Sequence, residues 1–262
     1  MNPRGITSAF LLTALTLACV AGTATAATFT LTFERAIPAP DGNTFALDVA
    51  ADGTLWAHGL NTHTFYQLDP LTGTVLRSFS SNGSVLFGIG LSGGTIYGSQ
   101  EPAIERFDVA SGTQLSSITG PSVGGSRGLT FIAGKLYVLG VFAGFPGQVR
   151  LGRTDPTTGT LLSSCAPAGA VFSEVIGRIG PYACYVMTNA GNDTLRIVDP
   201  DTGALIEDHY LFSGSDVYYS AFSSPTELFV TRRDLDQIWV YSYESPVEVR
   251  PMSWGAIHAL YR

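Results

Sequence analysis

Four charged side chains are the first candidates for chemistry in this chain, because charged residues make up only 13% of it. All four fall at or near the ends of short apolar runs, where a β-rich protein places its loops. They are Arg127, Glu174, Arg232 and Arg233. They could form one polar binding cluster if the fold brings their loops together. Solvated loop charges with one structural ion pair are the competing interpretation.

Two polar residues, His58 and Asn189, complete the set of binding candidates. His58 and His63 are close in sequence, but no third ligand lies near them, and a zinc site needs at least three protein ligands. We therefore predict no metal site from the histidines and no cofactor. The sequence identifies no catalytic residue, so a catalytic function stays uncertain and a binding function is favoured.

Two glycine-rich segments match catalytic motifs but lack the context that those motifs require. Residues 88–93 have the spacing of the dinucleotide-binding motif, and residues 124–128 have that of the nucleophile elbow. Both motifs need a helix directly after the glycines. Here the surrounding residues predict strands and hairpins, so we assign neither segment a function.

A repeated turn indicates the elements that position these residues. The pattern Asp-x-x-Thr/Ser-Gly occurs at residues 69–73, 108–112, 155–159 and 199–203. Its copies are spaced 39, 47 and 44 residues apart, a period typical of repeat folds. The Asp side chain accepts backbone hydrogen bonds, and the Gly takes a left-handed conformation. The turns are therefore interpreted as structural, with calcium binding by Asp199 and Asp201 as the alternative.

Each copy of the turn belongs to a group of four short β-rich runs. In the first group these runs cover residues 45–50, 54–57, 64–68 and 74–79. The second run of each group contains an apolar residue followed by an aromatic one. These pairs are Leu55-Trp56, Ile96-Tyr97, Leu136-Tyr137, Cys184-Tyr185 and Leu228-Phe229. Five units result, at residues 45–85, 86–125, 126–172, 173–217 and 218–245.

The last unit is incomplete, since it has three runs and no turn of the repeated type. A single strand at residues 28–33 has no group of its own. Pairing of this strand with residues 237–243 would complete the last unit and remove exposed sheet edges. We therefore predict an all-β fold: a five-bladed β-propeller of four-stranded meanders, with the ring closed by strand 28–33.

The repeats resemble those of exported bacterial β-propellers of the YVTN-like and quinoprotein-like groups. In those proteins Gly-x-Leu-Tyr strands alternate with Asp-Pro-x-Thr-Gly turns. The resemblance covers residues 45–245 and implies the fold only. The quinoprotein enzymes carry a Trp a few residues after the Thr-Gly pair, whereas residues 74–77 and their counterparts lack one. Bound quinone is therefore not expected.

Two families of propeller enzymes provide further comparisons. Plant-type glutaminyl cyclases look similar but carry Glu-Gly-Leu in their first strands, where this chain has residues 89–91 and 127–129, without the carboxylate. Lactonase-type propellers bind a divalent metal through Glu, Asp and Asn. Glu174, Asp48 and Asn189 could supply such ligands, although no spacing selects them. A glutaminyl-cyclase-like or metal-dependent hydrolase therefore remains the alternative function.

The first 26 residues have the order of a secretory signal. A charge at Arg4 precedes an apolar run at residues 9–20, and residues 24–26 supply the small-x-small cleavage pattern. We expect the propeller domain to cover residues 27–245 and a tail residues 246–262. The product would be extracellular or periplasmic, with lipid anchoring through Cys19 as a second possibility.

The net charge bears on the class of partner, and the two remaining cysteines bear on the covalent structure. The net charge of −7 argues against nucleic acid, which needs a basic surface. Cys165 and Cys184 are an even pair in an exported chain, and we expect a disulfide between them. The favoured hypothesis is a monomeric, non-catalytic secreted propeller with no membrane span. It would bind a protein, peptide or glycan through the loops at one mouth of its channel, where the first strands begin and the second strands end.

Overall fold

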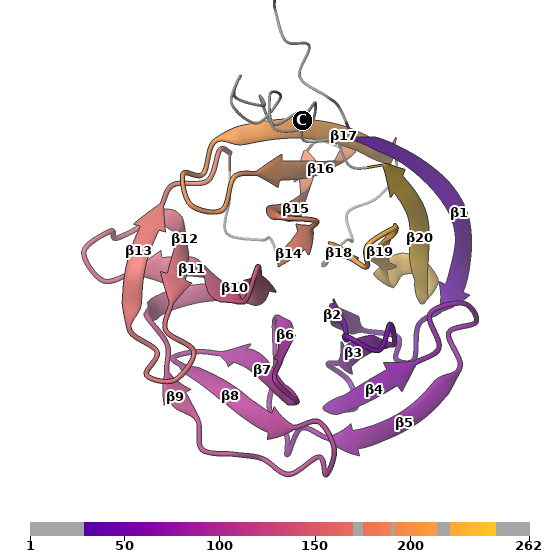
Figure 1. Cartoon of the computed structure of the whole chain (residues 1–262), viewed down its shortest axis with the longest axis horizontal. Helices are drawn as coiled ribbons and strands as arrows, with labels where there is room; N and C mark the ends of the chain where they lie inside the picture. Colours follow the sequence, from indigo (N-terminus) through magenta and orange to yellow (C-terminus); the bar gives the residue numbers. More distant parts are fainter. Residues whose placement is uncertain (1–28, 170–174, 190–191, 214–220, 245–262) are drawn as a thin grey trace, which may run out of the picture. The chain divides into compact units, whose positions relative to one another are not determined.

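The computed structural model describes residues 29–169, 175–189, 192–213 and 221–244, and these residues form an all-β structure (Figure 1). Their one helix is the short 3-10 helix η1 (Arg233–Leu235). Within the described residues, no helix has the length and apolar content needed to cross a bilayer. The predicted signal (residues 1–26) and the predicted tail (residues 246–262) lie outside the described residues.

Three separate antiparallel sheets contain four strands each, and in each one the strands pair in chain order. The first sheet consists of β2 (Thr44–Val49), β3 (Leu55–Gly59), β4 (Thr64–Leu68) and β5 (Val75–Ser80). The second consists of β6 (Ile89–Ser92), β7 (Thr95–Gln100), β8 (Ala103–Asp108) and β9 (Ile118–Thr119). The third consists of β10 (Ser122–Ile132), β11 (Lys135–Phe142), β12 (Val149–Thr154) and β13 (Leu161–Cys165).

The remaining eight strands form two further sets of four. One set is β14 (Ile176–Ile179), β15 (Tyr182–Asn189), β16 (Asn192–Val198) and β17 (Leu205–Ser213). The other is β18 (Ala221–Ser223), β19 (Glu227–Arg232), β20 (Gln237–Glu244) and β1 (Thr30–Pro38). A parallel bridge between Arg178 and Phe222 connects the two sets. The expected pairing of the N-terminal strand with the last run is present, from Thr30 opposite Glu244 to Pro38 opposite Gln237.

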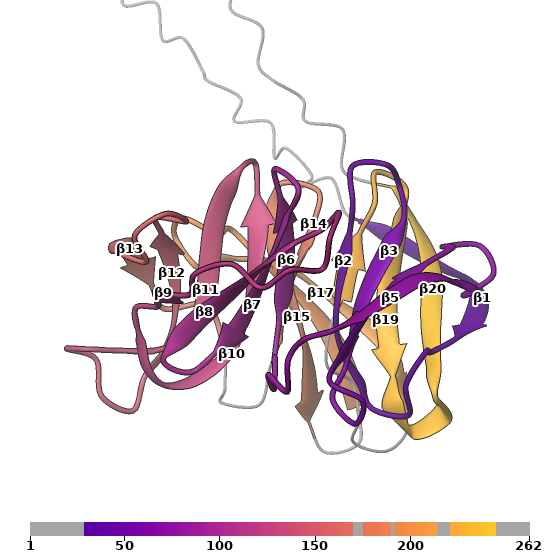
Figure 2. The same cartoon turned by 90° about the horizontal axis from the view of Figure 1, so that it is seen from below.

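The first strands of the five sets lie beside one another. Strand β2 contacts β6, β6 contacts β10, β10 contacts β14, β14 contacts β18, and β18 contacts β2 again. Figure 1 shows the first strands near the centre of the described residues, with the later strands of each set farther out, and Figure 2 shows β2, β6 and β14 side-on near the middle. Residues on the first strands therefore face the centre from every set.

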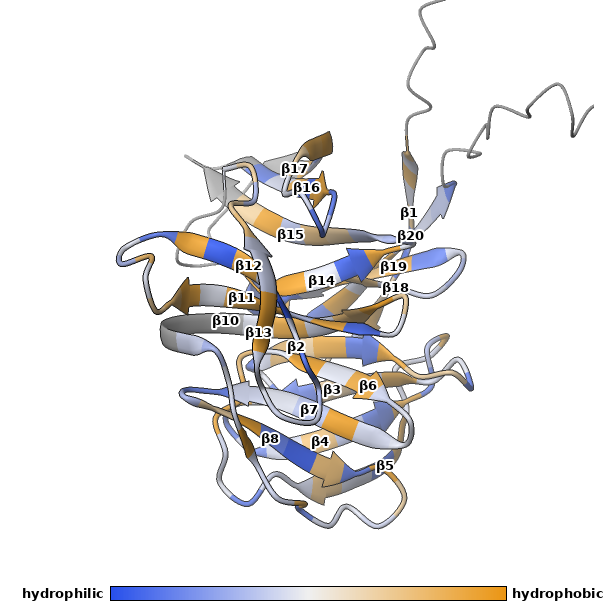
Figure 3. Ribbon diagram, turned by 60° about the vertical axis from the view of Figure 1, so that its left-hand side comes forward, coloured by the Kyte–Doolittle hydropathy of each residue, from blue (hydrophilic) through white to orange (hydrophobic). Residues whose placement is uncertain are grey.

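Five clusters of buried apolar side chains hold the sets together, and each cluster lies between two consecutive sets. Leu47 and Leu55 of the first sheet, for example, pack against Phe222 of β18. Trp56 and Phe65, from the same sheet, pack against residues of the second sheet. Neighbouring residues of a strand point to opposite faces, so each sheet supplies alternate residues to two clusters. Figure 3 shows hydrophobic positions, in orange, along many of the strands.

The repeated turns form the joints between consecutive sets. In the first copy, the Asp69 carboxylate accepts hydrogen bonds from the backbone N–H groups of Leu71 and Thr72 at 2.8 and 3.1 Å. The four turn glycines all have positive φ, and each lies against the outer strand of the preceding set or the residues just after it. The contacts are Gly73 with Pro38, Gly112 with Phe79, Gly159 with Thr119, and Gly203 with Ala166. The turns are therefore structural, as expected, and they also limit the distance between sets.

A matched pair of glycines in the third sheet tests this joint. Gly159 and Gly134 have φ values of +77° and +75°, but a Cβ on Gly159 would collide with the Thr119 carbonyl, whereas a Cβ on Gly134 meets open space. We expect Gly134→Ala to cost about 1 kcal/mol of unfolding free energy through backbone strain alone. Gly159→Ala should cost roughly 2 kcal/mol more through overpacking. Urea unfolding of both variants would measure this difference. Equal losses of unfolding free energy would contradict a close contact between the Gly159 turn and the preceding set.

Candidate functional site

A pocket of about 890 Å³ lies among the described residues. It lies over the first strands, at the face where each first strand turns into the second. Its walls come from the hairpins after β2, β6, β14 and β18, together with Val109 and Tyr243. The hairpin residues are Val49 to Gly53, Leu91 to Gly94, Gly180, and Ser223 to Pro225. Arg178 also lines this space, which we call the hairpin pocket.

Asp48 lies beneath the hairpin pocket on β2, and only 1% of its side chain is exposed. Its Oδ2 accepts a hydrogen bond of 2.6 Å from the backbone N–H of Leu91 on β6. Its Oδ1 accepts one of 2.7 Å from the N–H of Val49. Burial raises the pKa of Asp48 to about 6, although Arg178 and the two backbone donors act in the opposite direction.

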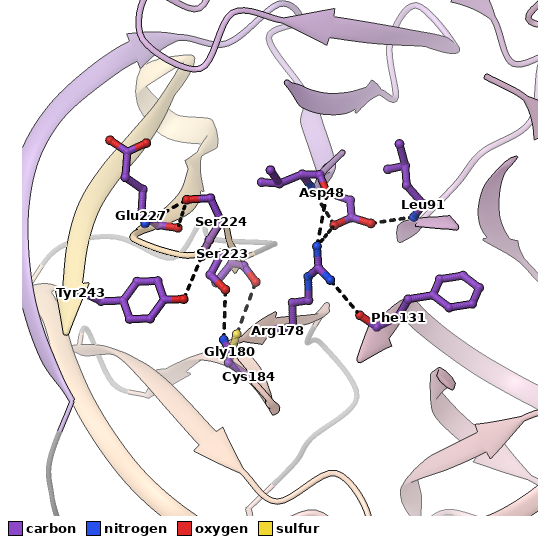
Figure 4. Close-up of polar contacts among 12 residues, drawn as sticks. Asp48, Leu91, Phe131, Arg178, Gly180, Cys184, Ser223, Ser224, Glu227 and Tyr243 are labelled. Atoms are coloured by element: carbon purple, nitrogen blue, oxygen red, sulfur yellow. Dashed lines mark hydrogen bonds and ion pairs between the residues drawn. The ribbon is translucent and has the colours of Figure 1, made fainter. Parts of the chain in front are cut away.

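Arg178 extends from β14 toward two other first strands, β2 and β10 (Figure 4). Its Nη2 lies 3.3 Å from Asp48 Oδ1 and donates to the carbonyl of Val49 at 3.2 Å. Its Nη1 donates to the carbonyl of Phe131 on β10 at 3.3 Å. Asp48 and Arg178 thus connect the first strands of four sets, and 28% of the Arg178 side chain remains exposed.

The fifth set joins this network through serines. Ser223 Oγ accepts a hydrogen bond of 3.1 Å from the N–H of Gly180, and the Tyr243 hydroxyl donates to the Ser224 carbonyl at 2.8 Å. Figure 4 shows these contacts beside the Asp48–Arg178 pair. The pocket therefore combines a guanidinium, hydroxyl groups and hairpin backbone on a base of connected strands.

This pocket opens at the face that the sequence argument did not favour. We expected ligands at the opposite mouth, where the first strands begin, and placed Arg127, Glu174 and Asn189 there. Arg127 lies in β10 and Asn189 at the end of β15, but the positions of their side chains are outside what the structure describes. Glu174 lies outside the described residues. Their grouping therefore stays a prediction.

Arg232 and Arg233 lie at the end of β19 and the start of η1. The guanidinium of Arg232 forms a two-pronged pair with Asp234 at 2.7 and 2.8 Å and stacks on the ring of Trp239 at 4.3 Å. Arg233 is exposed. Neither side chain lines the hairpin pocket.

His58 is part of the core of the first sheet. It is fully buried on β3, its Nε2 lies 3.1 Å from Ser81 Oγ, and its ring lies 5.1 Å from that of Phe65. Burial, with a smaller contribution from His63, lowers the pKa of His58 to about 4. The folded state therefore contains the neutral imidazole, and His58 does not line the pocket.

Acid should destabilise the protein through His58. Because its folded pKa lies below the unfolded value near 6.5, its contribution to stability is fully present above that pH and is lost as the pH falls toward 4. We expect His58→Gln to unfold with a shallower dependence on pH than the wild type between pH 6.5 and 4. Urea midpoints at four pH values would show this, and parallel curves would contradict it.

The expected disulfide between Cys165 and Cys184 is wrong for this structure, in which both are free, buried thiols. Cys165 packs in the cluster between the third and fourth sets, with Tyr185. Cys184 precedes Tyr185 on β15, points to the other face of that sheet and packs with Ala221 in the next cluster. The alternation of side chains along the strand therefore keeps the two sulfur atoms apart.

Labelling with a thiol reagent should show whether Cys165 and Cys184 are free and buried. Burial raises the pKa of both thiols, which suppresses the reactive thiolate. We expect a maleimide to label neither Cys165 nor Cys184 in the native protein and both in denaturant without prior reduction. We also expect a reductant to leave the melting temperature unchanged. Measurement of the intact mass would count the labels. Labelling in denaturant that requires a reductant would instead support a disulfide between the two cysteines.

The metal hypothesis named Asp48 with Glu174 and Asn189. Asp48 instead contacts Arg178 and two backbone N–H groups. Among the residues that the structure places, no three His, Cys, Asp or Glu side chains gather in one position.

One sequence signal could have indicated the site. Asp48 and Arg178 are each the single charge in a mostly apolar first strand, in residues 45–49 and 175–179. A charge in a buried strand needs a partner. The two are 130 residues apart, so the sequence did not show that they are each other's partner.

Comparison with known proteins identifies similar folds. The glutaminyl cyclase of Myxococcus xanthus is similar over 82% of this chain and 96% of its own, with 14% identity and a TM-score of 0.64. The PQQ-bound aldose sugar dehydrogenase of Streptomyces coelicolor is similar over 83% and 99%, with 12% identity and a TM-score of 0.54. No protein family model and no curated protein sequence matches the chain. These similarities confirm the resemblance to β-propellers at the level of the fold.

Proposed function

We propose that this chain is an exported five-bladed β-propeller that binds a small polar ligand in the hairpin pocket. The blades are the five sets of four strands, and β1 closes the ring by completing the set of β18, β19 and β20. Residues 1–26 act as the export signal, residues 27–245 form the propeller and the protein is a monomer. The observation that carries the binding function is the pocket itself, in which four hairpins converge on Arg178.

The geometry supports binding because the polar groups at the pocket's base are held in place. Asp48 accepts two short hydrogen bonds from backbone N–H groups, and Ser223 accepts one from Gly180. A volume of about 890 Å³ is in the range of small-molecule sites. Convergence of loops from rigid blades is also the usual way in which such folds form binding sites.

A pocket-filling variant tests this function. Ser92 lines the pocket, whereas Ser78 is an exposed residue of β5 outside it. A panel of free amino acids, short peptides, sugars and sugar acids would be screened by thermal shift against the wild type, Ser92→Trp and Ser78→Trp. We expect at least one compound to stabilise the wild type and Ser78→Trp but not Ser92→Trp. Stabilisation of all three proteins, or of none, would overturn the proposal.

A second candidate function is a cyclase acting on peptides with an N-terminal glutamine. The observation that favours it is the similarity to the Myxococcus xanthus glutaminyl cyclase, which extends over 96% of that chain. The absence of Glu-Gly-Leu at residues 127–129 argues against it. Ammonia released from a glutaminyl peptide would support the cyclase, and no release above that from boiled protein would reject it.

A further inference from the structure

We propose that the hairpin pocket holds its ligand through one carboxylate, which binds the guanidinium of Arg178, and that the ligand is a short neutral peptide with a free C-terminus. This inference rests on the proposed function of the pocket and specifies the ligand. It depends on the charges around the pocket, on the bonds of Arg178, and on what holds Asp48 in place.

Arg178 is the cation of the pocket. Among the residues lining it, the other charged side chain is Asp52, in the hairpin after β2. The Asp52 carboxylate accepts hydrogen bonds of 2.9 and 2.6 Å from the N–H and hydroxyl of Thr54, and these lower its pKa. Asp52 is thus ionised and bonded within its own hairpin. A single guanidinium suits a single carboxylate, which it can bind through two N–H groups.

The existing bonds of Arg178 are long. Charge-assisted N–H···O bonds usually measure about 2.7 to 2.9 Å. The pair of Arg178 with Asp48 measures 3.3 Å, whereas Arg35 pairs with Glu227 at 2.7 Å and Arg196 with Asp208 at 2.6 Å. Arg178 therefore lacks a short charge-assisted bond of the kind that Arg35 and Arg196 make, and a ligand carboxylate in the pocket can supply one.

Asp48 does not depend on Arg178 for its position. Its two shortest hydrogen bonds come from the backbone N–H groups of Val49 and Leu91, at 2.7 and 2.6 Å. If a ligand carboxylate takes over the guanidinium, Asp48 keeps both of these donors. The exchange therefore leaves no buried carboxylate without a partner, which would otherwise be costly.

The rest of the pocket selects the body of the ligand. Ser92, Gly93, Gly94 and Ser224 supply hydroxyl and backbone groups, which match the amide groups of a peptide. A sugar acid would need an aromatic surface for its ring. The lining offers little such surface, because Tyr243 is its one aromatic residue. A phosphate would bring a second negative charge close to Asp48 and Asp52. The lining thus favours an uncharged peptide body ending in a carboxylate.

Binding should strengthen in mild acid, since a protonated Asp48 neither repels the ligand carboxylate nor competes for Arg178. The groups that face Arg178 are Asp48 on β2 and the carbonyls of Val49 and Phe131. Cys184 on β15 also lies within electrostatic range, and its pKa is raised by burial. Asp52 and Tyr243 are the other titratable residues of the lining.

The test uses the full-length mature protein and calorimetric titration with four probes. They are N-acetyl-trialanine, its C-terminal amide, glucuronate and inorganic phosphate. We expect the acid to bind, the amide to bind at least about tenfold more weakly, and binding of the acid to tighten from pH 7 to pH 5, as expected for loss of a charged hydrogen bond. Arg178→Met should weaken binding of the peptide acid by a similar factor, and Arg196→Met is the matched control.

Several results would overturn the inference. Equal binding of the acid and the amide to the wild type would do so without any variant, even if Arg178→Met fails to fold. Tighter binding of glucuronate or phosphate would replace the peptide with another ligand class. Failure of all four probes also rejects it. The screen of the wider panel against Ser92→Trp tests separately whether the pocket binds a ligand. A wrong ligand class can therefore be distinguished from a pocket that binds nothing.

Discussion

Deletion of β1 (Thr30–Pro38) is expected to abolish the folded, soluble state. The strand pairs with β20 along its whole length, and Ile37 and the preceding Phe29 are both buried. Without β1, the backbone edge of β20 and the aromatic residues Tyr241 and Tyr243 lose their cover. Circular dichroism and size-exclusion chromatography would measure the loss. A soluble deletion variant with cooperative unfolding near the wild-type midpoint would contradict the closing role that we propose for β1.

A pair of cross-strand cysteine variants tests the register of β1 against β20, and a pair shifted by two residues is the matched control. Thr32 lies opposite Ser242, whereas Thr30 lies opposite Glu244. Only directly opposed residues come close enough for a disulfide of normal geometry. We expect Thr32→Cys with Ser242→Cys to oxidise to a bridge, and Thr30→Cys with Ser242→Cys to stay reduced. Bridging of the second pair alone would show a different register.

Asp48→Ala is expected to destabilise the protein by about 3 kcal/mol, since it removes the acceptor for two backbone N–H groups and leaves Arg178 without its charge partner. Asp48→Asn retains an oxygen of similar position and should cost about 1 kcal/mol. Urea unfolding of the two variants at neutral pH measures the difference. Equal losses would show that the hydrogen bonds of Asp48 contribute little.

The same residue gives a dependence on pH opposite to that of His58. The folded pKa of Asp48, about 6, lies above its ordinary value of 3.8, so its contribution to stability is fully present below pH 3.8 and is lost as the pH rises through about 6. Asp48→Asn does not titrate, and its stability relative to the wild type should therefore improve between pH 4 and pH 6. A constant difference over that range would mean that Asp48 titrates as it does in the unfolded chain.

Most of the local structure could be predicted from the sequence. The turn at residues 69–73 and its copies use residues whose own side chains and φ preferences form the turn, and the apolar–aromatic pairs mark second strands. These signals act over a few residues and need no tertiary contact. The pairing of β1 with β20 was also predictable, because one unit lacked a strand and one strand lacked a unit.

The candidate site could not be predicted in the same way. From the sequence we selected Arg232 and His58 as binding candidates, and the structure places them in an ion pair and in a sheet core. We also joined Cys165 to Cys184, which is wrong because they face different clusters. The direction of each of these side chains depends on the strand's register and on the neighbouring sheet.

The repeat thus determined by itself that this protein is a set of four-stranded meanders, since hairpins form from residues adjacent in the chain. Only the tertiary structure decided which hairpins converge into a pocket and that Arg178 lies across from Asp48, 130 residues earlier. The physical reason is that the apolar clusters between sheets set the position of one set against the next. Those clusters join residues far apart in the sequence, so no local pattern contains their geometry.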